Sequence, residues 1–275
     1  MYSRVYVEIG NICNKNCSFC HGTKREKRQM TFGEFKLTLS KIRHLTKYLY
    51  FHLMGEPLCH PEIIEFVKYA VTMGFKVAVT TNGTLLSRLG DALIKAGVYK
   101  VNISLHGFED ERERARYLDN CLNFADKASK CGVLTVLRLW NGFEDGGENS
   151  ETFARIKTFF EGEEWAFGSR GARIRDKLHL EYGERFEWPD INAENMGDNV
   201  FCYGLSDHFG ILSDGSVVPC CLDSDGVITL GNIFTGDIDE ILASPRAKEI
   251  VDGFKNKKAR EELCKRCGYA RRFKI

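Results

Sequence analysis

The stretch Cys13-Asn14-Lys15-Asn16-Cys17-Ser18-Phe19-Cys20 decides how the rest of this sequence is interpreted. It places three thiols in a Cys-x3-Cys-x2-Cys spacing, directly after the alternating run Val5–Ile9. A cubane 4Fe–4S cluster takes one thiolate on each of its four irons, so three local cysteines leave one iron open to a ligand that is not protein. A structural zinc site uses four ligands in short paired spacings, and no fourth Cys or His completes this set. The spacing therefore favours a catalytic iron–sulfur cluster.

Length and charge set the broad class of the protein. The chain has 275 residues, of which 43% are hydrophobic, enough for one large domain or a domain with a small appendage. Its net charge is +1, from 39 Lys and Arg against 38 Asp and Glu. This balance gives no electrostatic reason to expect nucleic acid or an anionic membrane as an obligatory partner.

The N-terminus and the cysteine count bear on where the protein works. The first residues, 1–4, run straight into a strand-like segment without an apolar leader, and no apolar run approaches the roughly 20 residues that span a bilayer. We therefore expect a cytoplasmic protein. In that compartment eleven cysteines indicate metal or redox chemistry rather than disulfides.

Strand-like and helix-like segments alternate along the first two thirds of the chain. The predicted strands are Arg4–Ile9, Tyr48–Leu53, Lys76–Thr80, Lys100–Leu105, Val133–Leu139 and Lys177–Glu181. The predicted helices between them are Thr31–Thr46, Pro61–Met73, Thr84–Ala96, Asp110–Lys130 and Asn149–Phe160. The first helix opens with Thr31 and has Glu34 three residues later, which is a capping-box pattern.

This alternation predicts an α/β fold with a parallel sheet and right-handed crossovers. Six strand–helix units are too few for a closed eight-stranded barrel, so we expect a partial (β/α)6 barrel of the TIM type. Its chemistry should lie at the carboxyl ends of the strands, and the cysteine stretch follows the first of them.

The cysteine stretch resembles the signature of the radical S-adenosylmethionine (radical SAM) enzymes. This resemblance implies that Cys13, Cys17 and Cys20 bind a 4Fe–4S cluster whose open iron chelates SAM, with the backbone around Phe19 near the adenine. The reduced cluster would cleave SAM to a 5′-deoxyadenosyl radical that abstracts hydrogen from a small hydroxylated substrate. It also implies a flavodoxin-like or ferredoxin-like electron donor.

Further SAM contacts are implied at successive strand ends. Met54-Gly55-Glu56-Pro57 resembles the Gly-Gly-Glu-Pro element that receives the SAM ammonium, with Met54 in place of the first glycine. Asn82 either belongs to the SAM pocket or forms a simple Asn-Gly turn, and Ser104 is expected near the ribose or carboxylate. Arg138 in an apolar strand needs an anionic partner, either the SAM carboxylate or a structural Asp or Glu.

Other polar residues at strand ends are candidates for contact with the substrate, by position alone. They are Glu8, His52, His106, His179 and Glu181. The basic run Lys24–Arg28 is interpreted as a solvated loop, or else as a rim that attracts an anionic substrate or an electron donor.

A second set of cysteines follows a polar linker at residues 191–199. Cys202, Cys220, Cys264 and Cys267 offer four thiols, and a hairpin is predicted around Asp214-Gly215 between the first two. Four thiols alone also suit a zinc ribbon. The pattern resembles the twitch domain, a shortened SPASM domain of radical SAM enzymes, which implies one auxiliary 4Fe–4S cluster.

We therefore predict a radical SAM domain at 1–190 and a small α+β twitch domain at 191–275. A single helix is expected over Ile238–Phe254 within it. The remaining cysteines are interpreted as non-ligands: Cys59, Cys121, Cys131 and Cys221.

The layout resembles two groups of small radical SAM enzymes, the 2-deoxy-scyllo-inosamine dehydrogenase and the queuine lyases. The first would oxidise an aminocyclitol-like alcohol, and the second would cleave a queuosine precursor during salvage. A peptide maturase is a third alternative. An iron–sulfur or zinc protein that senses redox state without catalysis is the alternative from a different class.

Overall fold

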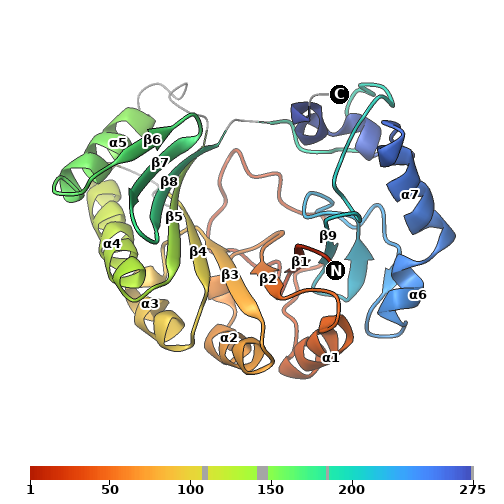
Figure 1. The fold of residues 1–275 in the computed structure, drawn as a ribbon, viewed down its shortest axis with the longest axis horizontal. Coiled ribbons are helices and arrows are strands. Elements are labelled where there is room, and N and C mark those ends of the chain that lie inside the picture. The colour runs from red at the N-terminus through yellow and green to blue at the C-terminus, as the bar shows by residue number, and fades with distance from the viewer. Residues whose placement is uncertain (107–110, 141–147, 184–185, 274–275) are drawn as a thin grey trace. The chain divides into compact units, whose positions relative to one another are not determined.

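The computed structural model describes residues 1–106, 111–140, 148–183 and 186–273. The chain divides into two compact units. Unit 1 comprises 1–62, 73–75 and 186–275, and unit 2 comprises 63–72 and 76–185. Figure 1 shows strands and helices alternating along the chain. The predicted division at residue 190 lies close to the start of the last segment of unit 1, and it stays a prediction.

Unit 1 is built on a mixed sheet in the order β11-β10-β9-β1-β2. Strand β1 (Arg4–Val7) pairs in parallel with β2 (Tyr48–Phe51) and with β9 (His208–Ile211). Strand β9 turns back into β10 (Ser216–Val218), as the predicted hairpin requires, and β11 (Gly231–Asn232) closes the edge. The strand that carries the cysteine loop is therefore flanked by a strand of the C-terminal region.

The helices of unit 1 are set by caps that the sequence encodes. Helix α1 (Phe32–Ile42) begins at Thr31, and the capping box with Glu34 is present, as predicted. The predicted helix over Ile238–Phe254 was wrong as a single element. It is α6 (Ile238–Leu242) followed by α7 (Pro245–Lys255), because Pro245 cannot continue a helix and Ser244 caps a new one. Three short 3₁₀ turns complete the unit: η1 (Pro57–Cys59), η2 (Cys264–Arg266) and η3 (Gly268–Arg272).

Unit 2 contains the other four predicted strands, in parallel and in the predicted order. They are β3 (Lys76–Thr81), β4 (Lys100–Ser104), β5 (Leu134–Trp140) and β8 (Leu178–Gly183). An antiparallel pair that the sequence reasoning missed, β6 (Ala166–Gly168) and β7 (Gly171–Arg175), extends this sheet beyond β8. The helices are α2 (Ile63–Thr72), α3 (Leu86–Lys95), α4 (Glu111–Lys130) and α5 (Glu148–Phe159).

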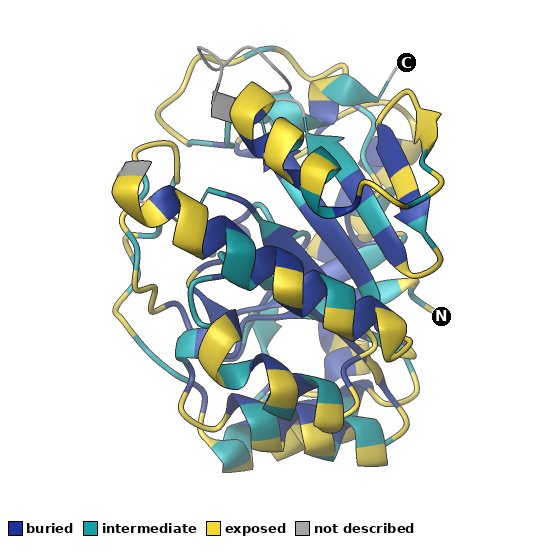
Figure 2. Ribbon diagram, turned by 90° about the vertical axis from the view of Figure 1, so that its left-hand side faces the viewer, coloured by how far each residue is buried: buried dark blue, intermediate teal, exposed yellow. Residues whose placement is uncertain are grey.

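The two faces of the unit 2 sheet differ in chemistry. Side chains alternate between the faces of a strand, and Val101, Ile103, Leu137 and Leu139 form one fully buried face. In Figure 2, seen from the helix-covered side, the helices alternate between buried and exposed bands, as amphipathic helices do. The opposite face carries polar residues, including Asn102, Ser104 and Arg138. Within the described ranges, no helix has both the length and the apolar character to cross a membrane.

Candidate functional site

The cysteine loop of unit 1 is closed at its base by backbone pairing. Met30 N–H donates to Ile9 O at 2.8 Å and Asn11 N–H donates to Arg28 O at 3.1 Å. The buried Asn11 side chain adds a bond from its Nδ2 to Glu26 O and accepts one from Arg28 N–H at its Oδ1, each at 2.8 Å. The long insertion between β1 and α1 is therefore held at both ends.

The three thiols of this loop lie near one another at its surface. Cys20 N–H donates to Cys17 O at 3.0 Å, which folds the Cys-x2-Cys segment into a turn. Cys13 and Cys20 are exposed and Cys17 is half-buried. Burial, then the neighbouring Cys20 and Cys13, raises the pKa of Cys17. Three accessible sulfur donors fit a cluster that keeps one iron open to a small ligand. Phe19 between them is also exposed.

The Gly55-Glu56 segment is packed directly against the start of the cysteine loop. Glu56 N–H donates to Ile12 O at 2.9 Å, one residue before Cys13. Gly55 has φ +79°, and a Cβ atom there would come within 2.6 Å of Gly10 O. Glu56 is buried, and its carboxylate accepts from Leu58 N–H at 3.0 Å. The backbones of the two segments therefore approach closely at Gly55, and this approach does not need a glycine at Met54.

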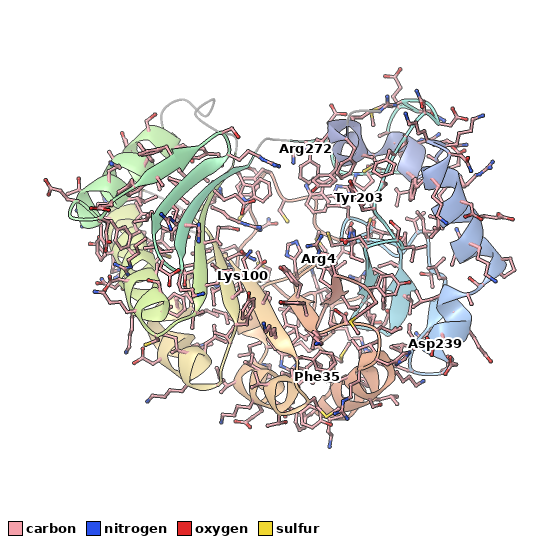
Figure 3. All side chains as sticks on the ribbon, viewed as in Figure 1. Arg4, Phe35, Lys100, Tyr203, Asp239 and Arg272 are labelled. Atoms are coloured by element: carbon pink, nitrogen blue, oxygen red, sulfur yellow. The ribbon has the colours of Figure 1, made fainter. Side chains whose placement is uncertain are left out.

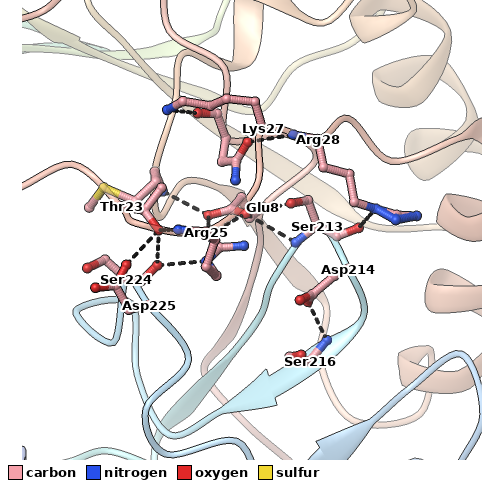
Figure 4. A network of polar contacts seen from close by, with 12 residues as sticks. Glu8, Thr23, Arg25, Lys27, Arg28, Ser213, Asp214, Ser216, Ser224 and Asp225 are labelled. Atoms are coloured by element: carbon pink, nitrogen blue, oxygen red, sulfur yellow. Dashed lines mark hydrogen bonds and ion pairs between the residues drawn. The ribbon is translucent and has the colours of Figure 1, made fainter.

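Glu8 is the centre of a buried polar network rather than an open catalytic group (Figure 4). Arg25 donates to both of its carboxylate oxygens, at 2.8 and 2.7 Å. Ser213 N–H and Oγ–H also donate to Glu8, at 3.1 and 2.8 Å, and Met54 N–H donates at 3.2 Å. With five hydrogen bonds from four donor atoms to a side chain of 0% exposure, Glu8 has a structural role and is not a proposed substrate contact.

The same network ties the cysteine loop to the C-terminal region. Thr23 donates to Asp225 Oδ1 at 2.7 Å, and Arg25 Nε donates to Ser224 O at 2.8 Å. Arg28 Nε donates to Ser213 O at 3.1 Å and Arg28 also pairs with Glu34. The basic run was predicted to be either a solvated loop or a rim that attracts an anion. Neither prediction describes Arg25 and Arg28, which are bonded to other residues of the protein. Their residue types gave no hint of partners that lie about two hundred residues away.

The four cysteines of the extension are brought together by its turns. Cys220 follows β10, Cys264 opens η2, and Cys267 caps η3. Burial and then neighbouring thiols, which include all three other members of the set, raise the pKa of Cys220 well above its usual value. Burial likewise raises the pKa of Cys267 to about 11. Buried thiols with this mutual repulsion become ligands when a cationic metal centre compensates their charge, so the set fits an iron–sulfur cluster.

Among the residues that the structure describes, no three of His, Cys, Asp or Glu are arranged to hold a single metal ion. A cubane spreads its thiolates over separate irons and does not need that arrangement. The other cysteines lie as expected for non-ligands. Cys221 packs with Tyr6 against Leu53, Leu212 and Val218, and Cys121 is fully buried. Cys59 is half-buried and Cys131 is exposed.

The ends of β3 and β4 in unit 2 are joined by a residue that the sequence reasoning did not single out. Tyr117 Oη of α4 lies 2.8 Å from Asn82 O and 2.9 Å from Ser104 O. The Asn82 side chain accepts from Thr84 N–H at 3.0 Å and from its hydroxyl at 2.7 Å, so it stabilises the turn that the simpler alternative predicted. The backbone carbonyls of Asn82 and Ser104, both predicted SAM contacts, are therefore held by the buried Tyr117.

Arg138 has the anionic partner that its position requires, and the partner belongs to the protein. Its Nε lies 3.1 Å from Glu181 Oε2, across neighbouring strands β5 and β8. This is the structural alternative that we had weighed against the SAM carboxylate, and it also accounts for Glu181. The other candidates lie on both units. His52 is near the Tyr6 ring in unit 1, His106 accepts from Trp140 N–H at 3.1 Å, and His179 lies beside Val136.

These features define an α/β iron–sulfur protein with a three-thiol cluster loop after its first strand and a second, four-thiol set in a C-terminal extension. The sequence pattern of the radical SAM superfamily matches residues 7–156, and that of the SPASM iron–sulfur cluster-binding domain matches residues 202–268. The chain belongs to the radical SAM superfamily. It is an enzyme whose cofactors are SAM and iron–sulfur clusters, and its predicted fold class, a partial barrel with an iron–sulfur extension, is confirmed.

Several known proteins are similar to the chain. GTP 3′,8-cyclase of Chlorobaculum tepidum is 33% identical over 297 aligned positions, covering 92% of this chain and 89% of the relative. AdoMet-dependent heme synthase of Methanosarcina barkeri is 31% identical over 103 residues, and the chain spans only 30% of its length. The crystal structure of BtrN in complex with AdoMet and 2-DOIA matches 97% of this chain and 93% of BtrN, with a TM-score of 0.61 and 19% identity. Because the sequence identity with BtrN is low, this similarity concerns the fold alone.

Proposed function

We propose that this enzyme oxidises a small hydroxylated molecule by removing hydrogen from a carbon that bears a hydroxyl group. When bound, SAM and the two clusters supply the 5′-deoxyadenosyl radical and an acceptor for the remaining electron. Cys13, Cys17 and Cys20 would hold the SAM-binding cluster, and Cys202, Cys220, Cys264 and Cys267 the auxiliary one. The electron donor would be a small flavodoxin-like or ferredoxin-like protein.

The observation that carries the proposal is the complete set of four half-buried thiols that lie close together in the extension. Four thiolates occupy every iron of a cubane, which suits electron transfer rather than substrate ligation. An oxidation needs such an acceptor, whereas a redox-neutral rearrangement or bond cleavage does not. BtrN, whose fold is similar to that of this chain, was solved with AdoMet and 2-DOIA, and we propose a substrate of that small-molecule class here.

The residues of this chain would position the reactants and accept the hydroxyl proton. The Gly55-Glu56 backbone, Pro57, Asn82, Ser104 and the region of Phe19 remain the proposed SAM contacts. Arg138 is held by Glu181 and would present its remaining guanidinium donors. His179 is the proposed base, because burial, with Lys100 and Arg173 nearby, lowers its pKa and keeps the imidazole neutral at pH 7.

The experiment uses the anaerobically reconstituted full chain with SAM and a reductant, and the probes are 2-DOIA, GTP and queuine. Oxidation predicts 5′-deoxyadenosine together with a product that lacks two hydrogen atoms, and transfer of deuterium from the carbinol carbon to 5′-deoxyadenosine. Cleavage of queuine into two fragments would contradict the proposal and would indicate lyase chemistry instead. A product with the same number of hydrogen atoms as its substrate would also contradict the proposal and would indicate a rearrangement, as in a cyclase.

A further inference from the structure

The strand register of unit 2 places two polar rows on the sheet face opposite its helices. Ser104, Arg138 and Glu181 are paired across β4, β5 and β8 and form the first row. The second row lies two residues further from the carboxyl ends of these strands and runs across five strands. Its members are Thr80, Asn102, Val136, His179 and Arg173. The first row includes Ser104, a proposed SAM contact. In the second row, only His179 has a role in the proposed function.

Asn102 is the first unusual member of this second row. Its side chain is 1% exposed, and its Nδ2 donates to Thr80 Oγ1 at 3.1 Å. Its Oδ1 is buried without a hydrogen-bond partner in the described part of the chain. Reversing the amide would exchange the two ends but would still leave one of them unpaired. Burying an amide oxygen without a hydrogen-bond partner is energetically unfavourable. A ligand that donates a hydrogen bond to Asn102 Oδ1 would remove this cost.

The other end of the row opens into a hollow of about 480 Å³. Its lining includes Val136, Arg173, His179 and Glu181, together with Arg170 of the β6–β7 turn. Within the described ranges, no carboxylate forms an ion pair with Arg170 or Arg173. Burial, then the neighbouring Lys100 and Arg173, lowers the pKa of His179, while Asp176 opposes the shift. Lys100 lies at the start of β4 (Figure 3).

The size of the row limits what it can hold. Neighbouring strands are about 4.8 Å apart, so Asn102 and Arg173, three strands apart, are separated by roughly 14 Å. A molecule that lies along this row would place a hydroxyl or amino group at the buried amide and an acceptor or anionic group at the guanidinium. Arg173 suits a phosphate or carboxylate because its planar fork matches both.

We infer that the second row binds the substrate, and that this substrate is a hydroxylated small molecule carrying a phosphate or carboxylate group. Asn102 would accept from or donate to a hydroxyl at one end, and Arg173 would bind the anion at the other, with His179 kept as the proposed base between them. The inference rests on the proposed function for its small-molecule class, and adds the anionic group and the residues that select it.

The test is calorimetric binding to the cluster-loaded full chain without reductant, with myo-inositol 1-phosphate as the probe. We expect it to bind on the order of tenfold more tightly than myo-inositol, the value of one charge-assisted hydrogen bond. Arg173→Gln should remove most of that difference. Inorganic phosphate and glucuronate, used as competitors, distinguish phosphate from carboxylate.

Two further variants keep the test decisive. Arg116→Gln removes a guanidinium from the exposed surface of α4 and should leave binding unchanged. Asn102→Val should weaken both the neutral and the charged probe while raising the thermal unfolding midpoint, because an unpaired amide is removed. Equal affinities for the two probes, no binding of either, or an Arg173→Gln variant that behaves like Arg116→Gln would overturn the inference. Since binding needs no turnover, failure of the oxidation assay alone leaves this result standing.

Discussion

Gly55 shows how the absence of one side chain positions the cysteine loop. Its φ of +79° belongs to the left-handed region, and a Cβ atom would lie 2.6 Å from Gly10 O and 2.8 Å from Asn11 C. Both of those atoms are backbone and cannot move without shifting the loop that carries Cys13. The glycine is therefore required by its conformation and by the space around it.

Gly55→Ala should destabilise the protein by about 3 kcal/mol or more, because strain and overlap add. Gly74→Ala is the matched control, since Gly74 also has a positive φ of +89° but open space around its Cα. It should cost about 1 kcal/mol, the conformational term alone. Urea unfolding gives both values. Equal losses for the two variants would show that the contact with Gly10 and Asn11 is unimportant.

The Arg25–Glu8 pair makes a second prediction at this scale. Arg25→Met leaves the fully buried Glu8 carboxylate without its cation, and should cost about 3–5 kcal/mol. The double variant with Glu8→Gln should lose less than the sum of the single variants. Lys68→Gln, which breaks an exposed pair with Glu65, should cost below about 1 kcal/mol. Strictly additive losses in urea unfolding would argue against a coupled pair.

At the scale of elements, the C-terminal extension is part of unit 1 and contributes strands to its sheet as well as the turns that carry the second set of thiols. Strand β9 lies beside β1, while the turns at Cys220, Cys264 and Cys267 present the second thiol set. Cys221, next in sequence to one proposed ligand, packs instead with Tyr6 against apolar side chains. Neighbouring cysteines thus have different roles.

Iron analysis of purified variants tests this difference. Cys220→Ser should lower the iron content from about eight to about four per chain, the loss of one cubane. Cys221→Ser should keep the iron of the parent protein, because its thiol packs against apolar side chains. Equal iron loss from both variants would contradict the assignment.

The elements that could be predicted from sequence are those with local signals. Thr31 and Glu34 specify the start of α1 by their spacing, and the alternation of each central strand gave its place to within a few residues. Strand β6 has only three residues, all exposed, and β7 has only five, with Gly168 and Gly171 at the turn between them, so these residues resembled a loop. The contact of Arg25 with Ser224 could not be predicted, because the two residues are distant in sequence and meet only through the fold.

At the scale of the whole molecule, the buried histidines link stability to pH. Burial is the main cause that lowers the pKa of His60, His179 and His208 below the ordinary 6.5. Below pH 6.5 the unfolded chain therefore binds more protons at these positions than the folded one. Stability should rise with pH through this window and be fully present above about 6.5.

The urea midpoint should fall between about pH 7.5 and pH 5.5, while most carboxylates stay ionised. His60→Gln removes one of these groups and should make the slope shallower, even if the variant is less stable throughout. His44→Gln is the control, since His44 is exposed in the turn that follows α1. A midpoint that stays constant or rises on acidification would contradict the sign of this linkage.

The chain as a whole is organised around a cluster that keeps one iron open for SAM. Electron paramagnetic resonance of the anaerobically reduced protein, recorded with and without SAM, tests this most directly. We predict a 4Fe–4S signal that SAM shifts, and that shift should be lost when Cys13, Cys17 and Cys20 are replaced by alanine. A fully loaded protein whose reduced signal is unchanged by SAM would contradict the account.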